Sequence, residues 1–231
     1  MIEGIALPGE TPISIDAGHG HEPLHGLLSL PARPSALIVL SHAGRTPEKR
    51  DEMLAMALRH AGVGVLTIDL LTPAEERFAD NHHNVPLLAR RLLDALALIK
   101  RQMRDEQLPG LPIGLCAAGD CSPVVLRVAA LRDHDIFAIV CRDGLIDLAG
   151  MLYLRSLASP LLVLVNVDDE NVVASNRRAL RELSGRKELK RLPGSVGAPD
   201  SAAAGEWVAG EATHWFLRHL PAATASAPDR A

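Results

Sequence analysis

Aromatic residues are scarce in this sequence, which has three Phe, two Trp and one Tyr among its 231 residues. So few rings offer little surface for stacking on nucleic-acid bases. The Lys and Arg residues are interspersed with acidic ones, at a formal net charge of −4. Nucleic-acid-binding proteins show the opposite pattern, a basic patch with aromatic side chains. We therefore expect no nucleic-acid partner.

Long hydrophobic runs are also missing. The apolar segments 36–40 and 161–165 are far shorter than the roughly 20 residues that a membrane helix needs. Residues 1–4 show neither the basic nor the apolar region of an export signal. The three cysteines are an odd number that does not suit a disulfide framework. We expect a soluble cytoplasmic protein with buried thiols and no contact with a membrane.

Hydrophobic residues make up 48% of the chain, enough for one sizeable core, and we predict a single domain over residues 1–220. From about residue 35 short apolar runs alternate with helical patterns, which is typical of a parallel sheet covered by helices on both faces. The strand-like runs are 36–41, 63–69, 112–118, 136–141, 161–166 and 189–192. Two earlier runs, 12–15 and 25–30, predict an antiparallel hairpin. The helical patterns cover 51–61, 85–104, 170–183 and 201–220, and the segment 221–231 is predicted to be disordered.

Six short segments lie within or just after these strands. They are 41–44, 69–72, 112–114, 141–150, 168–176 and 193–197. As a set they resemble the dienelactone-hydrolase-like α/β-hydrolases, and the similarity spans residues 12–220. The resemblance implies an α/β-hydrolase fold with a mostly parallel eight-stranded sheet. For an intact family member it also implies hydrolysis of an ester or a lactone.

The catalytic positions of that family are only partly filled in this chain. α/β-Hydrolases use a nucleophile on a tight strand-to-helix turn, an acid after a later strand and a histidine after the last strand. The resemblance places these three positions at Gly119, Asp169 and Gly197. No histidine occurs between His134 and His214, so the loop after the last strand has no base that would deprotonate a nucleophile. The sequence therefore predicts a pseudoenzyme in which only the acid, Asp169, is present.

A second register of the nucleophile turn competes with this one, because residues 114–118 also place small residues around a central Cys116. With the turn at Cys116, Pro123 would fall in the second turn of the following helix, where it removes a hydrogen bond and costs about 3 kcal/mol. With the turn at Gly119, Pro123 falls in the first turn, where the backbone N–H groups have no partner within the helix. We predict that Gly119 occupies the turn.

The pocket above this turn is the predicted ligand site. By the resemblance it is lined by His42, Ala43, Gly44, Gly119, Asp120 and Gly197. In the family the histidine after the first parallel strand shapes the loop near the oxyanion hole and is not the catalytic base. We expect a small-molecule ligand in this pocket, and neither a cofactor nor a metal ion.

The remaining histidines have simpler interpretations. His19, His21 and His25 are spaced like metal ligands, but they fall in a Gly-rich turn, and a zinc site normally needs four well-placed ligands. We interpret this cluster as a solvated turn. His82 and His83 lie in a polar helix entry, where capping explains them.

Three functional hypotheses follow. The first is a non-hydrolytic member that uses the pocket above Gly119, or another surface, for ligand binding or assembly. The second is a cysteine-dependent hydrolase of a lactone, ester or thioester, with Cys116 or Cys121 as nucleophile, Asp169 as acid and a base from elsewhere. The third is a structural partner of an active paralogue or of further copies of the chain. We favour the first, because two of the three catalytic side chains are absent.

Overall fold

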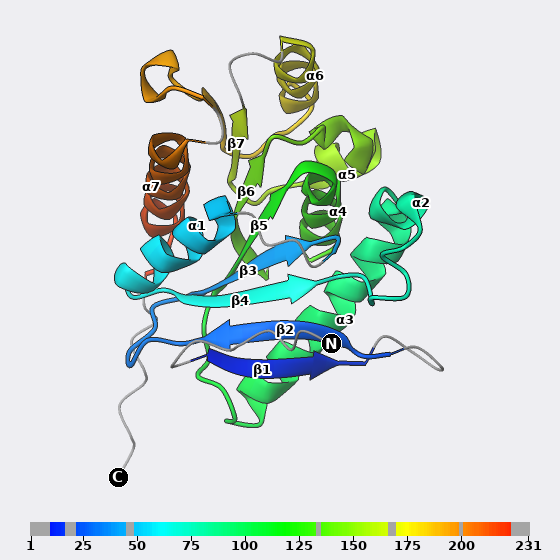
Figure 1. Ribbon diagram of the computed structural model, residues 1–231, viewed down its shortest axis with the longest axis vertical. Coiled ribbons are helices and arrows are strands. Elements are labelled where there is room, and N and C mark those ends of the chain that lie inside the picture. The colour runs from blue at the N-terminus through cyan, green and yellow to red at the C-terminus, as the bar shows by residue number, and fades with distance from the viewer. Residues whose placement is uncertain are drawn as a thin grey trace.

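The computed structural model describes residues 10–16, 22–44, 49–132, 135–165, 170–198 and 201–222 (Figure 1). These residues form an eight-stranded sheet with the order β1-β2-β4-β3-β5-β6-β7-β8. The strands are β1 (Glu10–Ile15), β2 (Leu24–Ser29), β3 (Leu37–His42), β4 (Gly64–Asp69), β5 (Ile113–Ala118), β6 (Ile136–Arg142), β7 (Leu161–Val165) and β8 (Lys187–Arg191). β2 pairs antiparallel with both β1 and β4, and the other neighbours pair parallel. The predicted fold class and the predicted hairpin are confirmed.

Helices cover both faces of this sheet. They are α1 (Lys49–His60), α2 (Ala79–His82), α3 (Val85–Arg104), α4 (Ser122–Leu131), α5 (Met151–Ser156), α6 (Glu170–Leu180) and α7 (Ala202–Arg218). α1 and α7 pack against each other on one face, and α3 and α4 pack together on the other (Figure 1). Within the described residues, no helix is both long and apolar enough to cross a membrane.

The buried side chains divide into two clusters because successive residues of a strand point to opposite faces of the sheet. In β3, Leu37 and Val39 face the cluster under α3 and α4, whereas Ile38 and Leu40 face the cluster under α1 and α7. A strand that is buried on both faces has no polar side, which explains the unbroken apolar runs of the sequence.

Two features of the fold differ from the sequence-based expectation. β8 begins at Lys187 and is rich in charge, with the sequence KELKR, so hydrophobicity alone placed it two residues too late. It is the last strand in the sheet order, and charged side chains on an edge strand discourage pairing with other chains. α2 and α5 were not predicted, because helices of four and six residues are too short to show a clear apolar stripe.

Candidate ligand-binding site

The turn after β5 sits at the centre of the site. β5 ends at Ala118, and the chain enters a 3-10 turn, η1 (Gly119–Cys121), which continues into α4. Gly119 has a φ of +51°, in the left-handed region that glycine adopts most easily. Pro123 lies in the first turn of α4, while Cys116 lies within β5. The predicted register, with Gly119 on the turn, is confirmed.

A second glycine, Gly144, packs closely against this turn. A Cβ placed on Gly144, just after β6, would lie 2.3 Å from both the carbonyl oxygen of Gly119 and Oγ of Ser122. Only glycine permits so close an approach. Asn176 of α6 is fully buried, and its side-chain amide donates to the carbonyl of Gly144 (2.9 Å) and accepts from the N–H of Ile146 (3.1 Å). The backbone geometry of this turn is therefore fixed by packing and hydrogen bonds.

A cavity of about 190 Å³ opens above Gly119, at the carboxyl ends of β3 and β5. Its described lining residues are Ser41, His42, Ala43, Asp51, His82, Ala118, Gly119, Asp120 and Cys121. Open α/β sheets bind their ligands at this edge. A Cβ built on Gly119 would meet no atom within 4 Å, so the space into which a nucleophilic side chain would project is open.

One wall of the cavity is fixed by a buried ion pair. Arg142, at the end of β6, donates a hydrogen bond to Asp51 of α1, and the two residues are only 3% and 5% exposed. His42 lies on the same carboxylate, with Nδ1 3.6 Å from Asp51 Oδ2. At that distance the contact is not a hydrogen bond. Asp51 is therefore charge-compensated by Arg142 and does not hold the imidazole in the geometry of a catalytic dyad.

The other wall is formed by the segment around α2. His82 Nε2 is 2.9 Å from the carbonyl oxygen of Glu76, which fixes its ring beside the cavity. His83 Nδ1 lies 3.1 Å from Asp120 Oδ2, with side chains that are 68% and 50% exposed. Asn84 caps α3 by accepting from the N–H of Leu87, so capping in this segment comes from the asparagine and not from the histidines. This segment joins the turn after β5 at the rim of the cavity.

The cysteine side chains are all buried. Burial, together with the nearby carboxylates of Asp120, Asp69 and Asp51, raises the pKa of the Cys121 thiol to about 12. Burial also raises the pKa of Cys116 to about 11, and that of Cys141 well above its usual range. Since the thiolate is the reactive form, none of the three is activated as a nucleophile.

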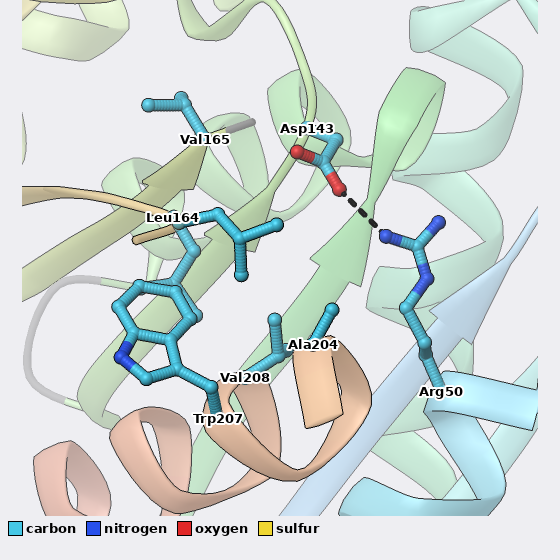
Figure 2. A pocket seen from close by; sticks show the side chains of 8 residues that line it. Arg50, Asp143, Leu164, Val165, Ala204, Trp207 and Val208 are labelled. Carbon is cyan, nitrogen blue, oxygen red and sulfur yellow. Dashed lines mark hydrogen bonds and ion pairs between the residues drawn. The ribbon is translucent and has the colours of Figure 1, made fainter. Parts of the chain in front are cut away.

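A second, narrower hollow lies where β7 ends, beside α7 (Figure 2). Arg50 of α1 and Asp143 point toward each other across it, with 3.2 Å between Arg50 Nη1 and Asp143 Oδ2. Asp143 has a φ of +51°, which is uncommon for a non-glycine residue. The hollow holds about 10 Å³, no more than the space of one water molecule. It is too small to take an organic ligand.

The structure brings together most of the predicted pocket. His42, Ala43, Gly119 and Asp120 line the cavity, and Gly44, which is not among the lining residues, follows Ala43 in the loop after β3. Asp169, His19 and His21 lie outside the described residues, as does the segment 223–231 of the predicted disordered tail.

Two predicted site residues lie away from the cavity lining. Cys116 projects into the core under α1 and α7, because its neighbours in β5 alternate between the two faces. Gly197 is exposed and lies in the loop after β8, where a Cβ added to it would come no closer than 4.0 Å to its nearest neighbour, Oγ of Ser201.

Sequence reasoning missed four functional-site residues: Ser41, Asp51, Arg142 and His82. A signal was present for two of them, because Ser41 and Arg142 fall inside segments that carried the family resemblance. No such signal marked Asp51, because an acidic residue in the first turn of a helix is common.

Comparison with solved structures finds the same fold in other proteins. Dienelactone hydrolase from Anabaena variabilis superposes with a TM-score of 0.79 at 28% identity, covering 92% of this chain and all of that one. Est1E from Butyrivibrio proteoclasticus superposes with a TM-score of 0.72 over 90% of this chain and 98% of its own, and its 14% identity supports the fold alone. The chain has the α/β-hydrolase fold.

Sequence comparison finds a second group of similar proteins. Proteins named "putative phosphoribosyl transferase" from two Mycobacterium tuberculosis strains are 33% identical over 203 residues, which is 87% of this chain and 45% of theirs. The chain thus spans about half the length of these curated relatives. No protein-family model matches the sequence.

Proposed function

We propose that this chain is a non-hydrolytic α/β-hydrolase-fold protein that binds a small molecule in the cavity above Gly119. One observation carries the proposal: the turn that bears the nucleophile in this fold is occupied by a glycine whose missing side chain leaves open space. Loss of the triad nucleophile removes covalent catalysis, and what remains is at most the weak effect of an oxyanion hole.

The lack of a histidine at the family's base position supports the same conclusion. The sequence has no histidine between His134 and His214, and the family position after β8 is Gly197. His214 lies on an exposed position of α7, not on the loop after β8. A buried thiol with a raised pKa does not replace a Ser-His pair.

The activity named for the mycobacterial relatives is not part of this proposal. This chain matches 45% of those proteins, and its described residues have the fold of dienelactone hydrolase. A phosphoribosyl transferase activity needs its own site, and the cavity above Gly119 has no lysine or arginine among its described lining residues to hold a diphosphate.

The test is turnover of short acyl esters and small lactones by the purified protein. We expect no rate above buffer for the wild type. The double variant Gly119→Ser with Gly197→His restores the two missing side chains and is expected to gain measurable esterase activity if the loop after β8 retains its geometry. Robust turnover by the wild type would contradict the proposal.

A second candidate, a cysteine-dependent hydrolase, is favoured by one observation: Cys121 lines the same cavity as His42. For this function Cys121→Ala must abolish wild-type turnover, whereas Cys141→Ala, a matched change of a buried thiol outside the cavity lining, must leave it intact. Turnover that survives Cys121→Ala would place the active site elsewhere.

A further inference from the structure

Two of the described residues that line the cavity carry a carboxylate. Asp51 and Asp120 line it, and Asp69 at the end of β4 is close enough to act on the Cys121 thiol. Among the described residues, no Lys or Arg lines the cavity. Arg142 neutralises Asp51, so among the described lining residues the carboxylate of Asp120 at the rim contributes most of the negative potential.

This field opposes the chemistry of an ester hydrolase. Hydrolysis develops an oxyanion beside the nucleophile, and such a charge is stabilised by donors and positive groups. Here the carboxylates make the Cys121 thiol harder to ionise, so they would penalise any anion bound at the same place. The same field stabilises a bound cation.

An independent feature points to a ligand in the cavity. Ser41 lines it, is only 1% exposed, and its Oγ has no hydrogen-bond partner among the described residues. A buried hydroxyl without a partner costs free energy, and most such groups in folded proteins are paired. A ligand with a polar group would supply the missing hydrogen bond.

We propose that the cavity binds a small organic cation, a protonated amine that also carries a hydroxyl group, with the ammonium near Asp120 and the hydroxyl near Ser41. This inference rests on the proposed function, because it names the ligand class of the same site. A volume of about 190 Å³ lies below the roughly 300–1,000 Å³ of pockets for drug-sized ligands, so the ligand is a short amino alcohol in size.

The Asp120 carboxylate is in contact with the solvent and with one neighbouring side chain. Its carboxylate is 50% exposed and faces His83 at 3.1 Å. The proposed ammonium lies at the rim beside this carboxylate. Exposure limits the effect of this one contact to roughly fivefold in affinity.

The experiment compares three probes of matched length: 3-aminopropan-1-ol, propane-1,3-diol and 3-hydroxypropanoate. Binding is measured by isothermal titration calorimetry and ligand-observed NMR near neutral pH. The amino alcohol is expected to bind more tightly than the diol, and the hydroxy acid least. Equal binding of the three, tighter binding of the hydroxy acid, or no binding of the amino alcohol overturns the proposed ligand class.

Three variants then test where the ligand binds. Asp120→Asn is expected to weaken the amino alcohol roughly fivefold and to leave the diol unchanged. Ser41→Ala weakens both. Asp94→Asn removes an exposed carboxylate on α3 that does not line the cavity, and it is the matched control with no effect. Amino alcohol binding that is insensitive to both Asp120→Asn and Ser41→Ala overturns the proposal.

A blocking variant separates failure of the ligand class from failure of the proposed function. Gly119→Leu fills the open space above the turn, and its fold is checked by circular dichroism. If the hydroxy acid binds and Gly119→Leu abolishes this binding, the ligand class is wrong and ligand binding in the cavity stands. Ester turnover by the wild type instead defeats the non-hydrolytic function itself.

Discussion

Two ion pairs join α1 to the end of β6 at neighbouring positions and with opposite polarity. Asp51 pairs with Arg142, and both residues are buried. Arg50 pairs with Asp143 at 3.2 Å, and these side chains are 23% and 37% exposed. The first pair borders the cavity above Gly119, and the second borders the narrow hollow beside α7.

The two pairs differ in their exposure to solvent, not in the type of contact that they make. An exposed pair contributes about 0–1 kcal/mol, because water screens it and competes for both partners. Breaking a buried pair leaves an uncompensated charge, which costs about 3–5 kcal/mol. The wall of the cavity is therefore strongly fixed and the wall of the hollow weakly fixed. A strongly fixed wall suits a binding site in the cavity, whereas the weakly fixed pair only packs the space beside α7.

The largest effect is expected for Asp51→Ala. It removes the carboxylate that compensates the buried Arg142 guanidinium, and we expect a loss of about 3–5 kcal/mol in the free energy of unfolding, measured by urea denaturation. The double variant Asp51→Ala with Arg142→Met removes both charges and should recover most of the loss. If the double variant is no more stable than Asp51→Ala, the pair is not the cause.

The openness of the cavity gives the second prediction. Gly119→Cys puts a thiol where no atom lies within 4 Å, whereas the natural cysteines are buried and burial raises their pKa values. We expect the variant to react with iodoacetamide at least about a hundredfold faster than the wild type, because thiolate fraction sets the rate.

A matched control for this labelling is Gly194→Cys, at a second position where an added Cβ meets nothing. It lies in the loop after β8 and should label at the rate of an ordinary exposed thiol. Rapid labelling of wild-type Cys121 would show that the cavity wall is not as rigid as the buried ion pair implies.

The sequence predicted the parts of this site that depend on local geometry. Pro123 fixed the register of the turn, and Gly119 supplied the left-handed residue there, so both could be inferred before the fold was known. The partnership of Asp51 with Arg142 could not, because the two are 91 residues apart and meet only after α1 packs on the sheet. Nor could the sequence predict that the Ser41 hydroxyl is buried without a hydrogen-bond partner among the described residues, because this burial arises only when the chain folds.

An intermediate case is the pair of Arg91 and Glu75, which are 2% and 17% exposed. The hydrogen bond from Arg91 lowers the pKa of Glu75 from 4.5 to about 2. A carboxyl with a lowered folded-state pKa stabilises the fold fully above its unfolded-state pKa and loses this contribution as the pH falls toward the folded-state value. We expect about 2 kcal/mol of stability to be lost between about pH 5 and pH 2.

Other carboxylates titrate in the same range, so the measurement is a difference. The pH dependence of unfolding is compared between the wild type and a Glu75→Gln, Arg91→Met double variant, which removes the pair without stranding a charge. The double variant should show a shallower loss of stability on acidification. Parallel profiles would mean that this pair behaves like an exposed one.

The smallest effect is expected at the exposed pair. Asp143→Gly removes the contact to Arg50 but relieves the φ of +51°, so the two changes nearly cancel, within about 0.5 kcal/mol. Asp143→Ala removes the contact and keeps the strain, and it should be less stable than Asp143→Gly by about 1 kcal/mol. Urea denaturation of both variants tests this order. A loss above about 2 kcal/mol in Asp143→Gly would put this pair in the same class as Asp51 and Arg142, and the contrast between the two walls would no longer hold.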